Sequence, residues 1–275
     1  MQEQYFLFAL ALLWTLFATF QDLRSREVAN WLNFSLIVFA LAFRAFYAIT
    51  KQNLQFFLFG IFGFAIFYGL AYAFYYSKVF AGGDAKLLMG FGVILPYNSY
   101  LSLLTLSLTF ISLLLTIGAI YSLIYSVFIA AKNKNKLKKE FKTLFSKNRV
   151  ILNTSLLIFL LSLIFGIIKP IILILSPILL IPILFVYTKA LEKCMLVLLP
   201  PNKLTEGDWL EHSIHLTKNK TIKKTVHGLS KEEISLLKKY KKHVLIKQGI
   251  PFVPAFLISL IILIFTSETL LSLLT

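Results

Sequence analysis

Two of the three aspartates in this chain stand at the edges of apolar segments, where a carboxyl group could do chemistry at a membrane surface. The three are Asp22, Asp84 and Asp208. Asp22 follows one long apolar run and Asp84 precedes another. Two carboxyl groups a few ångströms apart share one proton, because both cannot ionise together. One can then act as a base on water while the other acts as an acid, so Asp22 and Asp84 are candidate catalytic residues of an aspartic protease.

The residues beside these aspartates allow a second, simpler interpretation. Gly82 and Gly83 directly precede Asp84, and paired glycines let another backbone, such as an extended substrate, approach closely. The same Gly-Gly-Asp sequence is also a good turn followed by a helix N-cap at or near Asp84. Glu27 and its basic neighbours could likewise form an ordinary polar loop. The presence of two such aspartates on one predicted side of the membrane favours the catalytic interpretation.

The composition excludes several classes of protein. Hydrophobic residues make up 58% of the 275 residues, and the mean hydropathy is +0.81. Soluble domains are nearer 45–50% apolar, so a soluble, disordered or disulfide-linked secreted protein is excluded. The single cysteine, Cys194, excludes a paired-cysteine zinc site or haem attachment. The net charge of +16 is therefore interpreted as a signal of membrane orientation, with no nucleic-acid partner.

The apolar segments predict an all-α polytopic membrane protein with about eight transmembrane helices. A long uncharged run between Lys86 and Lys132 is expected to hold two helices, separated by a turn at residues 96–99. Lys169-Pro170 separates a later pair. The other predicted helices cover residues 5–20, 32–50, 54–76, 151–168, 171–188 and 251–271.

The basic residues predict the orientation of these helices. With the N-terminus outside, the inner segments are residues 21–31, 77–86, 131–150 and 189–250, and they hold 25 of the 28 Lys and Arg residues. Asp22 and Asp84 then face the cytoplasm at the plasma membrane. The first segment lacks a preceding basic residue and is expected to be a retained helix, not a signal peptide. Arg44, inside a predicted helix, is expected to snorkel outward, with a functional role within the membrane as the alternative.

Five regions are expected along the chain. Residues 1–130 form the membrane core with both aspartates, 131–150 a basic amphipathic helix, 151–199 an additional transmembrane pair, 200–248 a small cytoplasmic α+β unit, and 249–275 the last transmembrane helix. The basic helix is expected to lie on the anionic inner leaflet, with docking of a partner as the alternative. In the cytoplasmic unit, a hairpin is expected over 212–226, and Ser230 and Glu233 predict a capping box that opens a helix to about His243.

Three segments resemble the type IV prepilin peptidases, especially the archaeal members that process prearchaellins and archaeal prepilins. They are Asp22-Leu23-Arg24-Ser25-Arg26-Glu27-Val28-Ala29-Asn30-Trp31, Ala81-Gly82-Gly83-Asp84-Ala85-Lys86-Leu87 and Gly249-Ile250-Pro251-Phe252-Val253-Pro254-Ala255-Phe256-Leu257. The second resembles the family's Gly-x-Gly-Asp motif, with Ala81 in place of the first glycine. Archaeal preflagellin peptidases resemble six-span proteins, so the additional pair here is expected to be an insertion within 131–200.

This resemblance implies a membrane aspartic endopeptidase. Its substrates would be pilin-like or archaellin precursors, cut at the cytoplasmic face between a short basic leader and an apolar helix. Asp22 and Asp84 would be catalytic, without cofactor or metal. Bacterial members also carry a paired-cysteine zinc domain and a methyltransferase activity, and neither is expected here. Gly82 and Gly83 are expected to contact the substrate. Four acidic residues would receive the basic leader by charge complementarity: Glu27, Glu206, Asp208 and Glu211. A solvated turn is the alternative interpretation for Glu206, Asp208 and Glu211.

Other functions remain open on the sequence alone. A transporter or channel could use paired carboxylates to bind cations or relay protons, although it would normally place charge near the midplane and show an internal repeat. A catalytically inactive scaffold for pilus assembly and a presenilin-like protease with deeper aspartates are further alternatives. The four histidines have no metal-ligand spacing and are assigned no ligand role.

Overall fold

The computed structural model describes residues 2–217, 220–225 and 227–272. The chain divides into two compact units, which are described separately. The first contains residues 1–123 and 249–275, and the second contains residues 124–248. The long helix α5 (Tyr100–Lys132) contributes to both.

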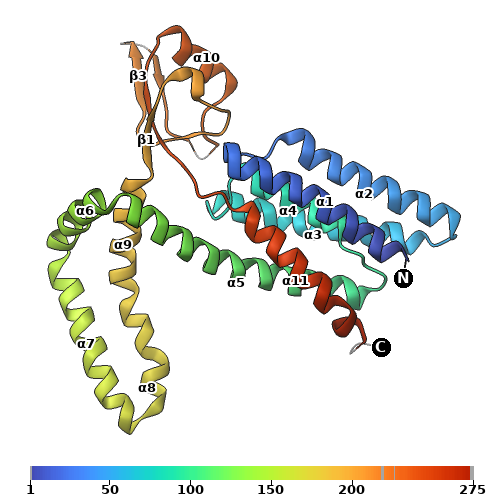
Figure 1. The fold of residues 1–275 in the computed structure, drawn as a ribbon, viewed down its shortest axis with the longest axis horizontal. Helices are drawn as coiled ribbons and strands as arrows, with labels where there is room; N and C mark the ends of the chain where they lie inside the picture. Colours follow the sequence, from blue (N-terminus) through green and yellow to red (C-terminus); the bar gives the residue numbers. More distant parts are fainter. Residues whose placement is uncertain (1, 218–219, 226, 273–275) are drawn as a thin grey trace. The chain divides into compact units, whose positions relative to one another are not determined.

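The first unit is a bundle of apolar helices (Figure 1). Besides α5, it contains α1 (Gln2–Ser25), α2 (Asn30–Thr50), α3 (Leu54–Tyr76), α4 (Gly82–Ile94) and α11 (Val253–Ser272). Helices α1 and α11 pack side by side, and α4 packs against α2 and α3. The predicted turn at 96–99 is confirmed, because α4 ends at Ile94 and α5 begins at Tyr100.

The lengths of these helices differ from the simple prediction of eight full spans. Six helical stretches in the described chain are long and apolar enough to cross a membrane. Helix α4 has only 13 residues, about 20 Å, whereas the hydrocarbon core is about 30 Å thick. In α11 the apolar stretch is also short, Val253–Ser267. A multi-pass membrane protein is therefore supported, and the number eight stays a prediction.

Glycines bring α3 and α4 unusually close together. A Cβ on Gly63 would lie 2.1 Å from the carbonyl oxygen of Gly92, and a Cβ on Gly92 would lie 2.5 Å from that of Gly63. Side chains pack around this contact: the rings of Phe91 and Phe110 stack at 4.4 Å, and Phe256 of α11 lies 5.7 Å from Phe91. Most of α4 is consequently buried inside the bundle.

The expectation that Arg44 snorkels to the membrane surface is wrong. Its side chain is fully buried, and the guanidinium donates hydrogen bonds to the carbonyl oxygens of Phe56, Val93 and Leu95. Three backbone acceptors inside the bundle replace the water that a snorkelling side chain would seek.

The second unit begins with a helical arm. It contains α6 (Lys134–Lys147), α7 (Arg149–Ile168), α8 (Pro170–Leu175), the 3-10 turn η1 (Ser176–Leu180) and α9 (Ile181–Cys194). The break predicted at Lys169-Pro170 is confirmed, and α7 lies beside the segment from α8 to α9 (Figure 1). Helix α6 packs on α9, and its apolar residues Phe141 and Leu144 are half-buried. The lysines of α6 stay exposed, so they remain available for the predicted contact with the anionic inner leaflet.

A small α+β region completes the second unit. Strands β1 (Leu196–Leu199), β5 (Val244–Lys247) and β2 (Trp209–Leu210) form an antiparallel sheet in that order, so the sheet begins before the expected boundary at residue 200. The turn η2 (Pro201–Lys203) follows β1. The predicted hairpin is confirmed but shorter, as β3 (Ile214–Thr217) paired with β4 (Lys220–Ile222). Residues 218, 219 and 226 of the expected hairpin lie outside the described residues.

The predicted capping box is confirmed at the start of α10 (Lys231–Lys239). The Glu233 N–H donates to Ser230 Oγ at 3.2 Å, and the Ser230 N–H donates to Glu233 Oε2 at 2.9 Å. The helix ends at Lys239 and not at His243, because Lys241 adopts a left-handed φ of 49°. Apolar residues of α10, the strands and the loops then form a separate small core.

Candidate functional site

Asp22 lies in the last turn of α1 and is fastened to the chain that enters α11. Its side chain is 5% exposed, and its Oδ2 accepts a hydrogen bond of 2.9 Å from the N–H of Val253. Arg26, just after the helix, adopts a left-handed φ of 60° and donates from Nη1 to the carbonyl of Gly249 at 2.8 Å. Two contacts therefore hold the start of α11 against the end of α1, and one of them orients the Asp22 carboxyl group.

Asp84 lies in the first turn of α4 and is 8% exposed. The expectation that it is at or near the N-cap is refined: Ala81 is the N-cap and Asp84 is the third residue of the helix. Its Oδ2 accepts a hydrogen bond of 3.3 Å from the N–H of Ala81. The carboxyl groups of Asp84 and Asp22 lie close enough to interact electrostatically. The fold thus brings the two candidate catalytic residues together in a buried setting.

Gly83 docks on the loop that follows Asp22, whereas Gly82 lies beside α3. A Cβ on Gly83 would lie 3.4 Å from the backbone nitrogen of Val28, and a Cβ on Gly82 would lie 3.7 Å from the ring of Tyr75. These are ordinary or slightly tight contacts, so the glycines are not required by packing alone. Their use in substrate binding stays a prediction. The backbone that approaches Gly83 in the structure is that of Val28, in the same chain.

Polar side chains of α2 complete this docking and were not identified from the sequence. Asn33 is fully buried, and its Nδ2 donates to the Gly83 carbonyl at 3.3 Å. Its Oδ1 has no hydrogen-bond partner among the described residues. Lys86 donates from Nζ to Asn30 Oδ1 at 2.7 Å. The available signal in the sequence was an asparagine, Asn33, inside an apolar segment, because a buried polar side chain needs a hydrogen-bond partner.

Aromatic rings surround the entry to α11. The Phe80 ring, 1% exposed, lies 5.3 Å from the Phe252 ring and 5.8 Å from the Phe256 ring. Gly118 of α5 accommodates Phe252, since a Cβ there would lie 2.4 Å from the ring. These rings pack around the entry to α11, where the Val253 N–H holds the Asp22 carboxyl group.

The predicted acidic contacts for a basic leader fall in two different units. Glu27 is exposed in the loop between α1 and α2, in the same unit as both aspartates. Glu206, Asp208 and Glu211 belong to the second unit. The structure does not gather these four acidic residues into one cluster within either unit.

The three acidic residues of the second unit have local partners. Glu206, whose side chain is 54% exposed, lies 3.6 Å from the Lys231 ammonium. Asp208 accepts a hydrogen bond of 2.9 Å from the Thr205 N–H, and burial raises the pKa of its carboxyl group. Glu211 is the most strongly paired of the three, at 2.7 Å from Lys193 Nζ. Glu206 therefore has the most freely available charge.

The pairing of Glu211 predicts acid-sensitive stability. Its hydrogen bond to Lys193, with added attraction from Lys224, lowers the pKa of Glu211 below the usual 4.5. A depressed folded-state pKa stabilises the fold above the unfolded-state pKa, and this stabilisation is lost as the pH falls through the folded-state value. We expect Glu211→Gln to lower the hydrogen-exchange protection factors of the β2–β5 amides at pH 7. The further fall of these protection factors on acidification should be smaller in the variant than in the unmodified protein. Glu232→Gln, on an exposed helix turn, serves as the control and should leave exchange in these strands unchanged.

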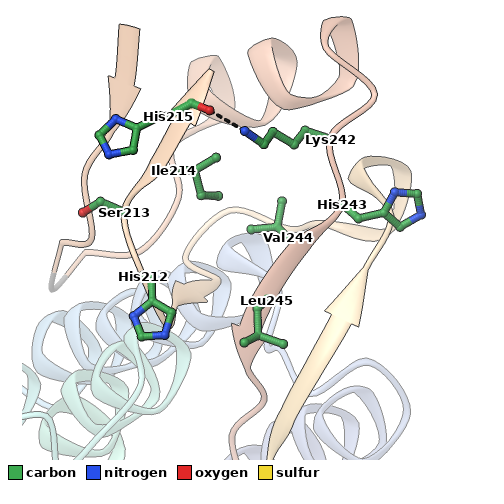
Figure 2. Close-up of a pocket in the computed structure, with 8 residues that line it drawn as sticks. All are labelled: His212, Ser213, Ile214, His215, Lys242, His243, Val244 and Leu245. Atoms are coloured by element: carbon green, nitrogen blue, oxygen red, sulfur yellow. Dashed lines mark hydrogen bonds between the residues drawn. The ribbon is translucent and has the colours of Figure 1, made fainter. Parts of the chain in front are cut away.

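Three of the four histidines, His212, His215 and His243, line a hollow of about 310 Å³ in the second unit. Figure 2 shows that the rings of His212, His215 and His243 point in different directions, and that Lys242 donates to the His215 carbonyl. Within the described residues, no three His, Cys, Asp or Glu side chains are placed to hold a metal ion.

Residues 9–131 match the type IV leader peptidase family. The preflagellin peptidase of Methanococcus maripaludis is 30% identical over 152 residues, which cover 50% of this chain and 65% of the relative. That of Methanococcus voltae is 30% identical over 93 residues, 34% of this chain and 40% of the relative. That of Methanocaldococcus jannaschii is 31% identical over 84 residues, 30% of this chain and 36% of the relative.

The chain thus spans less than two thirds of the length of each of these relatives. No solved structure matches it significantly. The family match covers α1 to α4 and nearly all of α5, and it contains both buried aspartates. Through this membrane region, the chain is similar to the type IV leader peptidase family.

Proposed function

We propose that this protein is a membrane aspartic endopeptidase that removes the short basic leader of pilin-like or archaellin precursors. One observation carries the proposal: Asp22 and Asp84 are buried together, and each is oriented by a backbone N–H. The family match, and relatives named preflagellin peptidase, support the substrate class. No methyltransferase activity is proposed.

In the proposed reaction the two carboxyl groups share one proton before water attacks. Asp22 is the better placed to carry the negative charge, since it accepts from the Val253 N–H and feels the positive charge of Arg26. It removes a proton from water, and the oxygen bonds to the carbonyl carbon of the scissile peptide. Asp84, protonated, transfers its proton to the carbonyl oxygen as the new carbon–oxygen bond forms, so the intermediate carries two hydroxyl groups.

The resulting tetrahedral intermediate then breaks its carbon–nitrogen bond. The leaving nitrogen takes a proton from the carboxyl pair, and the other oxygen proton returns to that pair. The products are a leader that ends in a carboxylic acid and a membrane helix that begins with an amine. The pair is thereby restored to its starting state, with one proton shared between Asp22 and Asp84.

The proposed orientation places this reaction at the cytoplasmic face, with the N-terminus outside. The support is the concentration of Lys and Arg in the segments assigned to the inside. The exposed lysines of α6 would contact anionic lipids there. Gly82, Gly83 and Glu27, which lie in the same unit as the aspartates, are proposed to contact the substrate next to the scissile bond.

A direct test is cleavage of a tagged precursor in membranes that contain the full chain. The precursor carries a short Lys-rich leader followed by an apolar helix. We expect a single cut at the junction, identified from the mass of the shortened product. Membranes without the protein are the control. If no plausible precursor is cut, an ion-binding or transport function moves ahead of the peptidase.

Leader recognition by the second unit is tested best at Glu206. Glu206→Lys reverses the most exposed of the three charges there, whereas Asp208 and Glu211 have structural partners. We expect the KM for a Lys-rich leader to rise about 3- to 10-fold at low salt with kcat unchanged, and the effect to shrink at high salt because salt screens exposed charges.

Glu232→Lys makes the same change of charge on an exposed turn of α10 and is the matched control. An equal rise in KM for both variants would attribute the effect to overall charge. An unchanged KM for Glu206→Lys would exclude leader recognition at this residue.

A further inference from the structure

Arg44 is a buried cation that is surrounded by backbone carbonyls. Its Nε donates to the Val93 oxygen at 2.8 Å and its Nη1 to the Phe56 oxygen at 2.6 Å, while Nη2 donates to the Leu95 oxygen. The guanidinium carbon also lies 4.6 Å from the centre of the Phe56 ring and 5.6 Å from that of Tyr97. Among the described residues no carboxylate forms an ion pair with Arg44.

These acceptors explain why a charge is placed there. Val93 and Leu95 are at the end of α4, where helix carbonyls lack partners within the helix. Because α4 is too short to cross a bilayer, these carbonyls face an apolar interior, where an unsatisfied backbone group is costly. A cation is also favoured at the C-terminal end of a helix dipole. Arg44 therefore supplies hydrogen-bond donors to the carbonyl groups at the buried end of α4, and these carbonyl groups supply acceptors to its guanidinium.

The surrounding helices are shaped around the Arg44 side chain. A Cβ on Gly60 of α3 would lie 2.5 Å from Arg44 Cδ and 2.9 Å from its Nε. Glycine at this position makes the space that the guanidinium stem occupies. One side chain thus ties α2, which carries it, to the start of α3 through Phe56 and to the end of α4 through Val93 and Leu95.

We propose that Arg44 is a positioning residue for the peptidase reaction, which rests on the function proposed above. Helix α4 carries Asp84 in its first turn, and Arg44 holds its last turn. A helix transmits displacement along its axis, so fixing the end of α4 sets how Asp84 meets Asp22. Arg44 contacts neither aspartate and acts only through α4.

The alternative is that other contacts already determine the position of α4. The Gly63–Gly92 contact fixes the spacing of α3 and α4, and Val28 and Asn33 hold the Gly83 end. In that case Arg44 contributes to stability alone. The two possibilities differ in whether a disturbance at Arg44 changes catalysis by molecules that remain folded.

Gly60→Ala is the primary test, because it displaces the guanidinium without removing it. We expect kcat per folded molecule to fall about 10- to 100-fold, since a displacement of about 1 Å from a remote mutation can have this effect, while KM changes less than about 2-fold. Gly69→Ala is the matched control: it makes the same substitution in the same helix, and its Cβ would have no neighbour within 4 Å. It should keep the activity of the unmodified protein.

Variants at Arg44 itself extend the test. Arg44→Lys keeps the charge and some donors and should restore most of the activity that Arg44→Ala loses. In the Arg44→Ala background, Gly60→Ala should add little further loss, because the colliding atoms are gone. A full additional loss from Gly60→Ala in that background would show that this glycine acts independently of Arg44 and would overturn the proposal.

A readout that needs no cleavage separates this inference from the proposed function. In a Cys194→Ser background, Val28→Cys and Gly83→Cys should form a disulfide, because a Cβ on Gly83 would lie 3.5 Å from the Val28 Cβ. We expect Gly60→Ala to slow its formation several-fold and Gly69→Ala to leave it unchanged. This result would hold even if no precursor were ever cut, in which case only the proposed function fails.

Two outcomes would overturn the positioning role. One is an equal rate of disulfide formation and equal kcat for Gly60→Ala and Gly69→Ala. The other is a lower melting temperature for Gly60→Ala with an unchanged kcat per folded molecule, which would leave Arg44 a role in stability alone.

Discussion

Replacing either Asp22 or Asp84 by Asn is expected to reduce leader cleavage by about 10²- to 10⁴-fold, the usual contribution of a positioned acid or base. Asn retains a side-chain oxygen that can accept from the Val253 or Ala81 N–H, so the local contacts seen in the structure are preserved. It removes the proton that the pair shares. The loss should appear in kcat, measured with the tagged precursor at matched expression.

The double variant distinguishes a coupled pair from two independent residues. When two groups act as a unit, removing the second after the first adds little further loss. We therefore expect the Asp22→Asn and Asp84→Asn double variant to be about as slow as either single variant. Glu232→Gln, a change at an exposed carboxylate outside the site, should cleave at the normal rate.

Normal cleavage by both single variants would contradict the two-aspartate mechanism. The buried pair would then have another use, and ion flux through reconstituted vesicles would be the next measurement, because paired carboxyl groups within a membrane also bind cations. Loss in only one variant would mean that the other aspartate is not required for the chemistry.

The second large effect is expected at the glycine contact between α3 and α4. In Gly63→Ala the new Cβ would lie 2.1 Å from the Gly92 oxygen and 2.4 Å from the Tyr97 ring. The Gly92 atom belongs to the backbone, so a whole helix must shift. We expect a loss of roughly 3 kcal/mol or more, beyond the usual cost of overpacking a core. It should be seen as a lower melting temperature and faster proteolysis in detergent.

The control for this change is again Gly69→Ala. Alanine favours a helix over glycine by about 1 kcal/mol, and both variants gain this benefit equally. Only Gly63→Ala carries the collision, so the difference between the two isolates packing from helix propensity. Equal melting temperatures for the two variants would mean that α3 and α4 are not in the close contact described here.

Local signals allowed several elements to be predicted from the sequence. The turn at 96–99, the break at Lys169-Pro170 and the capping box of Ser230 and Glu233 all depend on residues within a few positions of each other. The apolar segments that became long helices are equally local, since their length and hydropathy are properties of one stretch of chain. The short motifs around Asp22 and Asp84 also identified the two candidate residues.

Tertiary contacts determined what these local signals could not. The sequence predicted that Arg44 would reach for water, but three carbonyls from α3 and the end of α4 meet it inside the bundle. Asp22 is oriented by Val253, which is more than two hundred residues away in the chain. A hydropathy pattern describes one segment at a time and does not specify which distant donor or acceptor will satisfy a buried polar group.

The sequence by itself therefore determined the class of protein, the order of its helices and the two residues most suited to acid–base chemistry. Only the tertiary structure decided that α4 ends inside the bundle, that glycines bring α3 and α4 into contact, and that both carboxyl groups are held by backbone N–H groups. The physical reason is that composition and periodicity are set locally, whereas burial and hydrogen bonding depend on which helices pack together.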